Sequence, residues 1–140
     1  MKTAPDNFIQ TLQESGLGGD WEWENGSWWK TPQAMDVRLT TTLMISLQAR
    51  FVAITATERP DKEIRLDYQW DVNGQLLSFI TATTEQQIHS IADLCPAADW
   101  VERETREYFA VEFTGRENTK PLMTRAGDQI GINLHKEAVK

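Results

Sequence analysis

Three acidic side chains lie close together in one segment and are the clearest candidates for acid–base chemistry. Glu102, Glu104 and Glu107 fall within six positions, and neighbouring carboxylates can donate and accept a proton when their pKa values differ. No nucleophile–base arrangement accompanies them, because the serines and threonines near His89 show no nucleophile-elbow motif. We therefore expect no independent catalysis from this chain.

Ligands for a metal or a cluster are few and widely spaced. Cys95 is the single cysteine, so it forms no internal disulfide and cannot alone hold an iron–sulfur cluster, which usually takes four thiolates. His89 and His135 stand far apart, and neither a zinc nor a calcium spacing is present. The glycines at 16–19 follow a predicted helix rather than a strand, which favours a turn over a phosphate-binding loop. We expect no metal and no cofactor, with Cys95 as a packing residue.

Composition indicates one ordered domain, residues 1–140. The chain is 40% hydrophobic and 25% charged, as in ordinary globular proteins. Its net charge of −7 disfavours binding to nucleic acid or to anionic lipid. The most apolar stretch, 43–57, is too short to span a bilayer, and the N-terminus lacks the order of a signal peptide. We expect a cytoplasmic protein, or one bound peripherally to the cytoplasmic side of the inner membrane through partners.

The N-terminal part predicts a helix and a tryptophan-rich hairpin. Asp6 is a suitable cap for a helix over about 7–14. Four tryptophans follow within nine positions, Trp21–Trp29, around Asn25-Gly26, a dipeptide typical of a type I′ hairpin turn. The indoles can cover the end of a core, dock a partner or form a ligand platform, and the sequence leaves these interpretations open.

The central part predicts one helix and three strands. Met35, Leu39, Leu43 and Leu47 recur every four residues and favour a helix over about 33–48, although the three threonines at 40–42 weaken it. Strands are predicted at 51–57, 64–71 and 75–83, with turns at 59–62 and at Asn73-Gly74. Consecutive antiparallel strands form a meander with one buried face.

The C-terminal part predicts two further helices. Ile88, Ile91 and Leu94 give the apolar side of a short helix over 85–94. Asp99 is a candidate N-cap of the next helix, with Glu102 completing a capping box. Its aromatic face would carry Trp100, Val101, Tyr108 and Phe109, and Glu102–Arg106 and Arg103–Glu107 would pair at i, i+4.

Gly115 ends this region, and a last short strand is predicted over 130–134. The predicted fold class is therefore α+β: a mainly antiparallel sheet of three to five strands with helices packed mostly on one face.

The segment Pro96–Gly115, within a motif region over 95–125, resembles the signature of the 30 kDa subunit family of respiratory complex I. That family includes a subunit of NADH:quinone oxidoreductase and counterparts in energy-converting, membrane-bound NiFe hydrogenases. The signature reads approximately Pro-x-Ala-x-Trp-x-Glu-Arg-Glu-x-x-(Asp/Glu)-x-Phe-Gly-(Ile/Val)-x-Phe-x-Gly-His-Pro. The residues in register are Pro96, Ala98, Trp100, Glu102, Arg103, Glu104, Glu107, Phe109, Val111, Phe113 and Gly115.

Two departures from the signature stand at its end. Ala110 replaces a glycine that would permit a positive φ at the helix end, so that geometry is costlier here. Arg116-Glu117 replaces the His-Pro pair, and the basic pair that follows in the family is only echoed by Lys120 and Arg125. In the family this downstream stretch extends over the neighbouring large subunit. Its altered form here indicates that the partner can differ from that of the family.

The resemblance implies a non-catalytic, cofactor-free subunit that packs against the large, 49 kDa-like subunit of complex I or of a NiFe-type hydrogenase. Charged residues at helical spacing would orient the partner and aromatic residues would supply buried area. A free-standing protein-interaction domain unrelated to electron transfer is the alternative. The residues expected to contact the partner are Trp100, Glu102, Arg103, Glu104, Glu107, Phe109, Phe113, Gly115 and Arg116.

Overall fold

The computed structural model describes residues 21–24, 27–30, 36–61, 63–72, 74–83, 85–116, 122 and 131. The helix predicted over 7–14 lies outside the described residues. So does the strand predicted over 130–134, except for Gly131.

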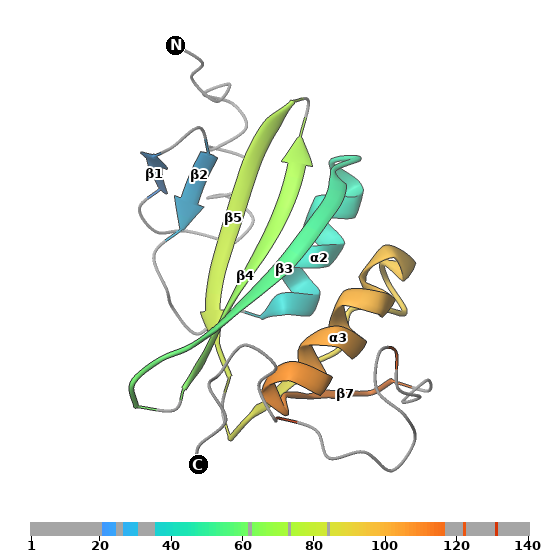
Figure 1. Ribbon diagram of the computed structural model, residues 1–140. Helices are drawn as coiled ribbons and strands as arrows, with labels where there is room; N and C mark the ends of the chain where they lie inside the picture. The colour runs from blue at the N-terminus through green and yellow to red at the C-terminus, as the bar shows by residue number, and fades with distance from the viewer. Residues whose placement is uncertain are drawn as a thin grey trace.

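One five-stranded sheet forms the centre of the fold (Figure 1). Neighbouring strands are antiparallel except for one parallel pair, between the second and fifth strands. The predicted α+β class, hairpin and three-stranded meander are confirmed. In spatial order the strands are β1 (Trp21–Glu24), β2 (Ser27–Lys30), β5 (Gln75–Ala82), β4 (Ile64–Val72) and β3 (Arg50–Glu58).

The central strand β4 supplies much of the core. Its side chains alternate between the two faces of the sheet, so every second one points into the core. Every second residue of β4 is buried, and the residues between them are partly exposed. The ring of Trp70 packs edge-on against Phe51, with 5.2 Å between the centroids. The buried β4 side chains are Ile64, Leu66, Tyr68, Trp70 and Val72.

The helix predicted over 33–48 is present as α2 (Val37–Ser46). Asp36 caps it, because its carboxylate accepts the backbone N–H groups of Arg38 and Leu39. The three threonines are tolerated because each hydroxyl donates to the carbonyl four residues earlier. The predicted apolar line is wrong at Leu39, which is 52% exposed, whereas Val37 and Met44 are buried.

The helix predicted over 85–94 is wrong. Glu85 and Gln86 have φ of 53° and 59°, which no α-helix accepts, and the chain continues as strand β6 (Gln87–His89). β6 pairs in parallel with β7 (Glu112–Thr114). The apolar spacing of Ile88, Ile91 and Leu94 suits a strand followed by a turn as well as a helix. The backbone hydrogen bonds between β6 and β7 favour the strand.

A short 3-10 turn, η1 (Pro96–Ala98), and the helix α3 (Asp99–Phe109) connect β6 to β7. Parallel strands need such a crossover. The predicted capping box is wrong, because Asp99 is already the first helical residue and Ala98 stands at the cap. The carboxylates of Asp99 and Glu102 have other partners, described below.

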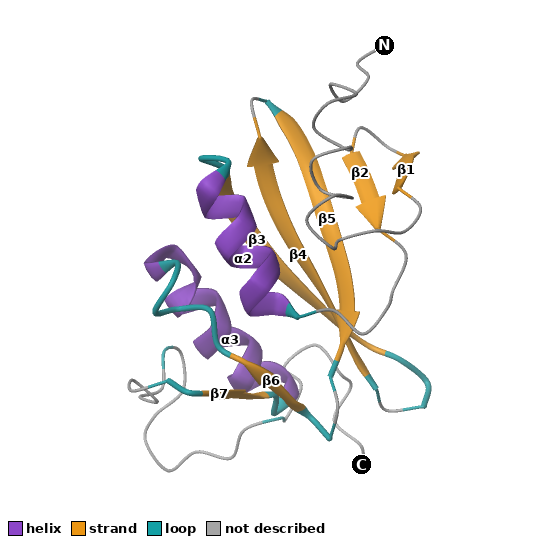
Figure 2. Ribbon diagram, turned by 180° about the vertical axis from the view of Figure 1, so that it is seen from behind, coloured by secondary structure: helices purple, strands orange, loops and turns teal. Residues whose placement is uncertain are grey.

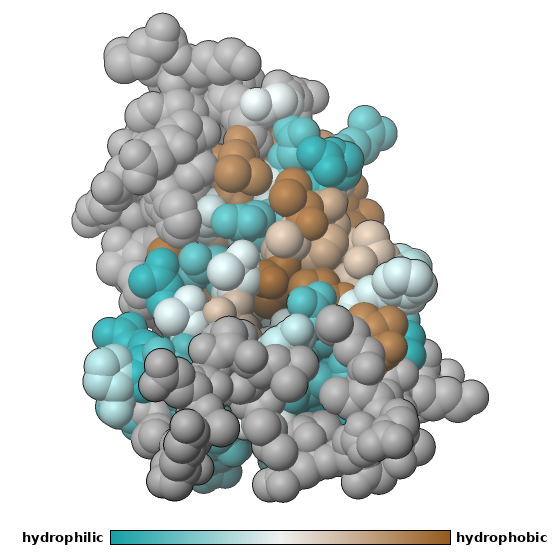
Figure 3. Space-filling model, viewed as in Figure 1, coloured by the Kyte–Doolittle hydropathy of each residue, from teal (hydrophilic) through white to brown (hydrophobic). Residues whose placement is uncertain are grey.

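α2 lies across one face of the large sheet, and α3 lies beside its edge strand β3 (Figure 2). Figure 3 shows the opposite face, where apolar residues gather over the strands. None of the helices in the described part of the chain is long and apolar enough to cross a membrane.

Candidate functional site

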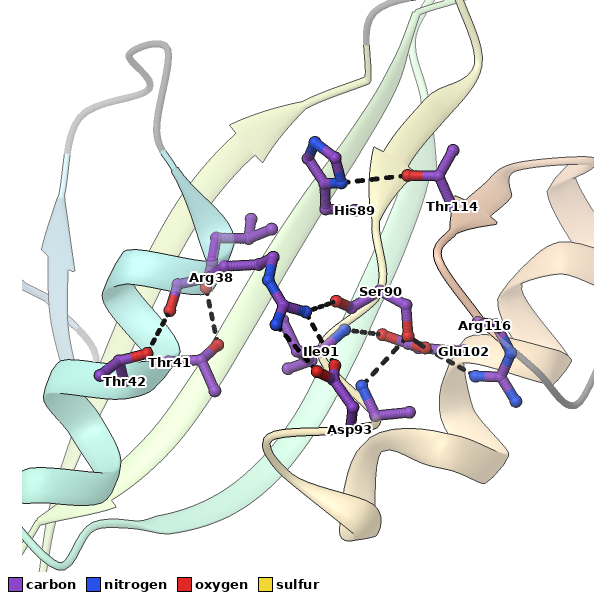
Figure 4. Close-up of polar contacts among 12 residues, drawn as sticks. Arg38, Thr41, Thr42, His89, Ser90, Ile91, Asp93, Glu102, Thr114 and Arg116 are labelled. Atoms are coloured by element: carbon purple, nitrogen blue, oxygen red, sulfur yellow. Dashed lines mark hydrogen bonds and ion pairs between the residues drawn. The ribbon is translucent and has the colours of Figure 1, made fainter.

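The first half of α3 is organised around a buried carboxylate. Glu102 is 0% exposed. Its Oε1 accepts hydrogen bonds from the Ser90 hydroxyl and from Arg116 Nη1, both at 2.6 Å, and its Oε2 accepts from the Ile91 backbone N–H at 2.8 Å (Figure 4). A carboxylate with this many donors is satisfied without water. Glu102 therefore joins α3 to the segment after β6 and to the segment after β7.

Arg116 balances the charge of this site. Its side chain is 4% exposed and pairs with Asp99 as well as with Glu102. Burial raises the pKa of Glu102, whereas the hydrogen bonds from Ser90 and Ile91 and the Arg116 guanidinium act in the opposite direction. The burial of Tyr68 and the nearby Glu102 charge both raise the pKa of the Tyr68 phenol.

Ser90 is the junction between the two helices (Figure 4). Its hydroxyl donates to Glu102 and accepts the Ala92 N–H, and its N–H donates to the Thr114 carbonyl. Its own carbonyl accepts from Arg38 Nη1 of α2 at 2.8 Å.

Arg38 also holds Asp93 through two bonds of 2.7 and 2.8 Å. The Arg38 guanidinium holds the pKa of Asp93 at about 2. α2 is thereby tied to the loop that precedes α3.

The second half of α3 contacts two described residues that follow β7, Leu122 and Gly131. Glu107 is 5% exposed, its Oε1 accepts the Leu122 N–H, and its carbonyl accepts the Gly131 N–H. The next turn ends at Ala110, which has φ 56° and ψ 36°, the left-handed geometry expected at this position. Gly131 lies directly against Ala110, since a Cβ added at Gly131 would stand 2.7 Å from the Ala110 Cβ.

The predicted site residues separate into a buried group and an exposed group. Trp100 is 69% exposed, and Glu104 is also exposed, one helical turn further on. Of the predicted aromatic face, Trp100 faces solvent, whereas Val101, Tyr108 and Phe109 are partly exposed. Arg103 and Phe109 are partly exposed, and Gly115 is exposed. Arg116 is partly exposed as a residue, but its side chain is only 4% exposed. The buried ones are Glu102, Glu107 and Phe113.

The three glutamates do not form a catalytic carboxylate pair. Glu102 is buried and hydrogen-bonded, whereas Glu104, two residues later on a helix, faces solvent. The predicted pair of Glu102 and Arg106 is replaced, because Arg106 binds Glu112 at 3.2 Å. Arg103 lies 3.5 Å from Asp99. Among the described residues, no three His, Cys, Asp or Glu side chains are grouped as a metal site.

Sequence reasoning missed Ser90, Arg38 and Asp93. Arg38 contacts Ser90, 52 positions later, and Asp93, 55 positions later. No local spacing in the sequence links α2 to a loop at this distance along the chain. The polar Ser90 between Ile88 and Ile91 was the available signal, since a buried serine needs a partner.

The fold places the chain in the α+β class, and a solved structure shares this fold. The solved structure titled "Nqo5 of the trypsin-resistant fragment (1-134) in P63 form" is similar, with a TM-score of 0.63 and 18% identity, over 79% of this chain and 98% of that one. At this identity the likeness shows the fold.

Sequence comparison then gives the family. The family model described as "Respiratory-chain NADH dehydrogenase, 30 Kd subunit" matches residues 33–138. The chain belongs to this family.

Two relatives that are similar in sequence are named as subunits of NADH-quinone oxidoreductase. The protein of Rhodopseudomonas palustris is 30% identical over 88 residues, which are 57% of this chain and 44% of the relative. That of Ruegeria sp. is 30% identical over 97 residues, 64% of this chain and 48% of the relative. The chain spans less than half the length of these relatives.

Proposed function

We propose that this chain is a non-catalytic, cofactor-free subunit of a complex I-like or energy-converting hydrogenase-like redox complex, in which it docks onto the large, 49 kDa-like subunit. Family membership and the names of the relatives support a place in a multi-subunit dehydrogenase. The complex would hold the chain peripherally on the cytoplasmic side of the membrane.

The observation that carries the docking role is the exposure of Trp100. A tryptophan that is 69% exposed on a short helix leaves a large apolar surface in water, and tryptophan is enriched among residues that dominate binding energy. The helix beneath it is held at Glu102 and Glu107 by contacts to three separate segments. Such a helix presents a fixed surface, which lowers the entropic cost of association.

The predicted contact residues divide into two roles under this proposal. Trp100 and Glu104 would contact the large subunit directly. Glu102, Phe113 and Arg116 would shape the surface from inside, since their side chains are almost inaccessible in the chain alone. Arg103 would serve both roles, because its side chain is 15% exposed and lies beside Asp99.

Replacing Trp100 with alanine tests this function. We expect the affinity for the purified large subunit to fall about 30-fold, the effect of losing a residue worth ~2 kcal/mol, with the urea midpoint nearly unchanged. The control is Leu39→Ala on α2, another large exposed apolar residue, 52% exposed. Equal affinity of the two variants would contradict the docking role of α3. If the wild-type chain binds no large subunit, docking onto that subunit is refuted, and a free-standing interaction domain becomes the favoured interpretation.

A further inference from the structure

A groove lies between α3 and β3, which is the edge strand of the large sheet among the described strands. Its volume is about 510 Å³. β3 is the last strand of the sheet, with β4 as its one strand neighbour among the described strands. Figure 1 shows α3 running beside β3 at this edge. The lining residues are Ala53, Ile54, Thr55 and Ala56 of β3, and Val101, Glu104, Thr105, Tyr108 and Phe109 of α3.

The groove faces the backbone edge of β3. Successive side chains of a strand point to opposite faces, so four consecutive residues, Ala53–Ala56, can line one hollow only if it opens along the edge. On the other wall, Val101, Glu104 and Tyr108 stand at i, i+3 and i+7, which places them along one stripe of the helix. A groove between a strand edge and a helical stripe is long and narrow, so it fits an extended polypeptide.

The edge of β3 carries little protection against pairing. Natural edges are usually blocked by proline, lysine, inward charges or bulges, or are covered by a helix or loop. α3 flanks the edge of β3, but the groove lies between the helix and Ala53–Ala56. β3 has a bulge between Phe51 and Ala53, but from Ala53 to Thr57 its pairing is regular and its side chains are uncharged. An edge strand of this kind is suited to accept a further strand through main-chain hydrogen bonds.

We propose that the groove receives an extended, basic segment of the large subunit, which pairs with β3 as an added strand. This inference rests on the proposed function and names the second contact of the same docking surface. Apolar side chains of the segment would alternate into the wall formed by Val101, Tyr108 and Phe109. A lysine or arginine would reach Glu104, which is exposed at the rim of the groove.

Charge decides between a partner segment and a second copy of this chain. The chain carries a net charge of −7, and the exposed charge on the helical wall is the carboxylate of Glu104. Like charges brought together at an interface are unfavourable, whereas opposite charges raise the association rate. A basic segment is therefore favoured over self-association.

The groove and the Trp100 surface are continuous. Trp100, Glu104 and Tyr108 are spaced four residues apart, so they follow one another along α3, and the last two also line the groove. A single partner can cover the exposed indole and extend a segment into the groove.

A cysteine-directed cross-link identifies the occupant. Thr55 is exposed on β3, and the native Cys95 is buried, so Thr55→Cys introduces an accessible thiol for a maleimide–benzophenone probe. In the complex assembled with the purified large subunit, we expect the photoproduct to join β3 to an extended basic segment of that subunit. Wild-type chain treated in the same way supplies the background from Cys95.

Reversing the charge of Glu104 tests the proposed basic segment through the affinity for the large subunit. Glu104→Arg is expected to weaken the complex about fivefold or more and to reduce its salt dependence. Glu85→Arg, the same charge change on an exposed residue outside the groove, is expected to leave affinity within twofold. Amide hydrogen exchange of Ala53–Ala56 is expected to slow in the complex.

The outcomes separate the inference from the proposed function. If the complex forms through Trp100 but the cross-link maps elsewhere, or the β3 amides exchange equally in both states, the added strand is refuted and the docking role stands. If the cross-link joins two copies of this chain, a second copy is the occupant and the partner segment is refuted. If no complex forms, both proposals fail.

Discussion

Replacing Glu102 with alanine should destabilise the chain strongly, because its carboxylate has three donors and is shielded from water. The Ile91 N–H would be left without its acceptor, which costs about 1–3 kcal/mol for a buried group. Arg116 would keep Asp99 alone while its side chain is 4% exposed, and breaking a buried ion pair costs about 3–5 kcal/mol. These costs overlap, since they arise at one carboxylate, so we expect a total loss of about 3–5 kcal/mol.

Urea unfolding followed by tryptophan fluorescence measures this loss. Trp70 is 1% exposed and should report the loss of the core. With a slope of about 1–3 kcal/mol/M, the midpoint should fall by at least ~1 M. Glu104→Ala, an exposed glutamate on the same helix, should stay within about 0.5 kcal/mol of the wild type. A loss below about 1 kcal/mol for Glu102→Ala would refute the structural role of this network.

Three further predictions concern the end of α3 and the acid range. Ala110→Gly should stabilise the chain by about 0.5–1 kcal/mol in urea unfolding, because glycine adopts φ 56° without the Cβ clash; unchanged stability would contradict this. Gly131→Ala should destabilise it by at least ~1 kcal/mol, and Ala110→Gly in the same chain should restore part of that loss; strictly additive effects would exclude the contact between the two residues. Asp93, with its pKa lowered from 3.8 to about 2, contributes stability above pH 3.8 that is lost as pH falls toward 2. Asp93→Asn should reduce this acid slope between pH 5 and 2, and an unaltered slope would show that the Arg38 pair does not couple to folding. Glu102 acts in the opposite sense, because its raised pKa makes its contribution decline as pH rises through that pKa.

Local patterns predicted the sheet well. The alternation in β4 fixed which face is buried, and the Asn-Gly dipeptides placed both hairpins, because strand period and turn chemistry are properties of neighbouring residues. The left-handed geometry at Ala110 was also foreseeable, since the family signature places a glycine there.

The errors arose where distant residues decide the structure. The strand β6 owes its conformation to β7, more than twenty residues later, so the local apolar spacing at Ile88 and Ile91 could not reveal it. The spacing of Asp99 and Glu102 resembles a capping box, so the sequence predicted that Glu102 caps the helix. Its real partners, Ser90 and Arg116, come from both sides of the helix in sequence.

The division of the signature into buried and exposed residues also lay beyond the sequence. Glu102, Glu104 and Glu107 are chemically alike, and helical spacing alone does not say which side of α3 meets the sheet. The structure buries the first and third and exposes the second. Docking mutations chosen from the motif alone would therefore mix effects on folding with effects on association.

The most direct test of the docking account is the affinity of the Trp100→Ala variant for the purified large subunit, measured beside the wild-type chain. The account predicts a clear complex with the wild type, an affinity about 30-fold lower for the variant and equal stability of the two chains. Wild-type affinity in the variant, or no complex with either chain, would contradict it.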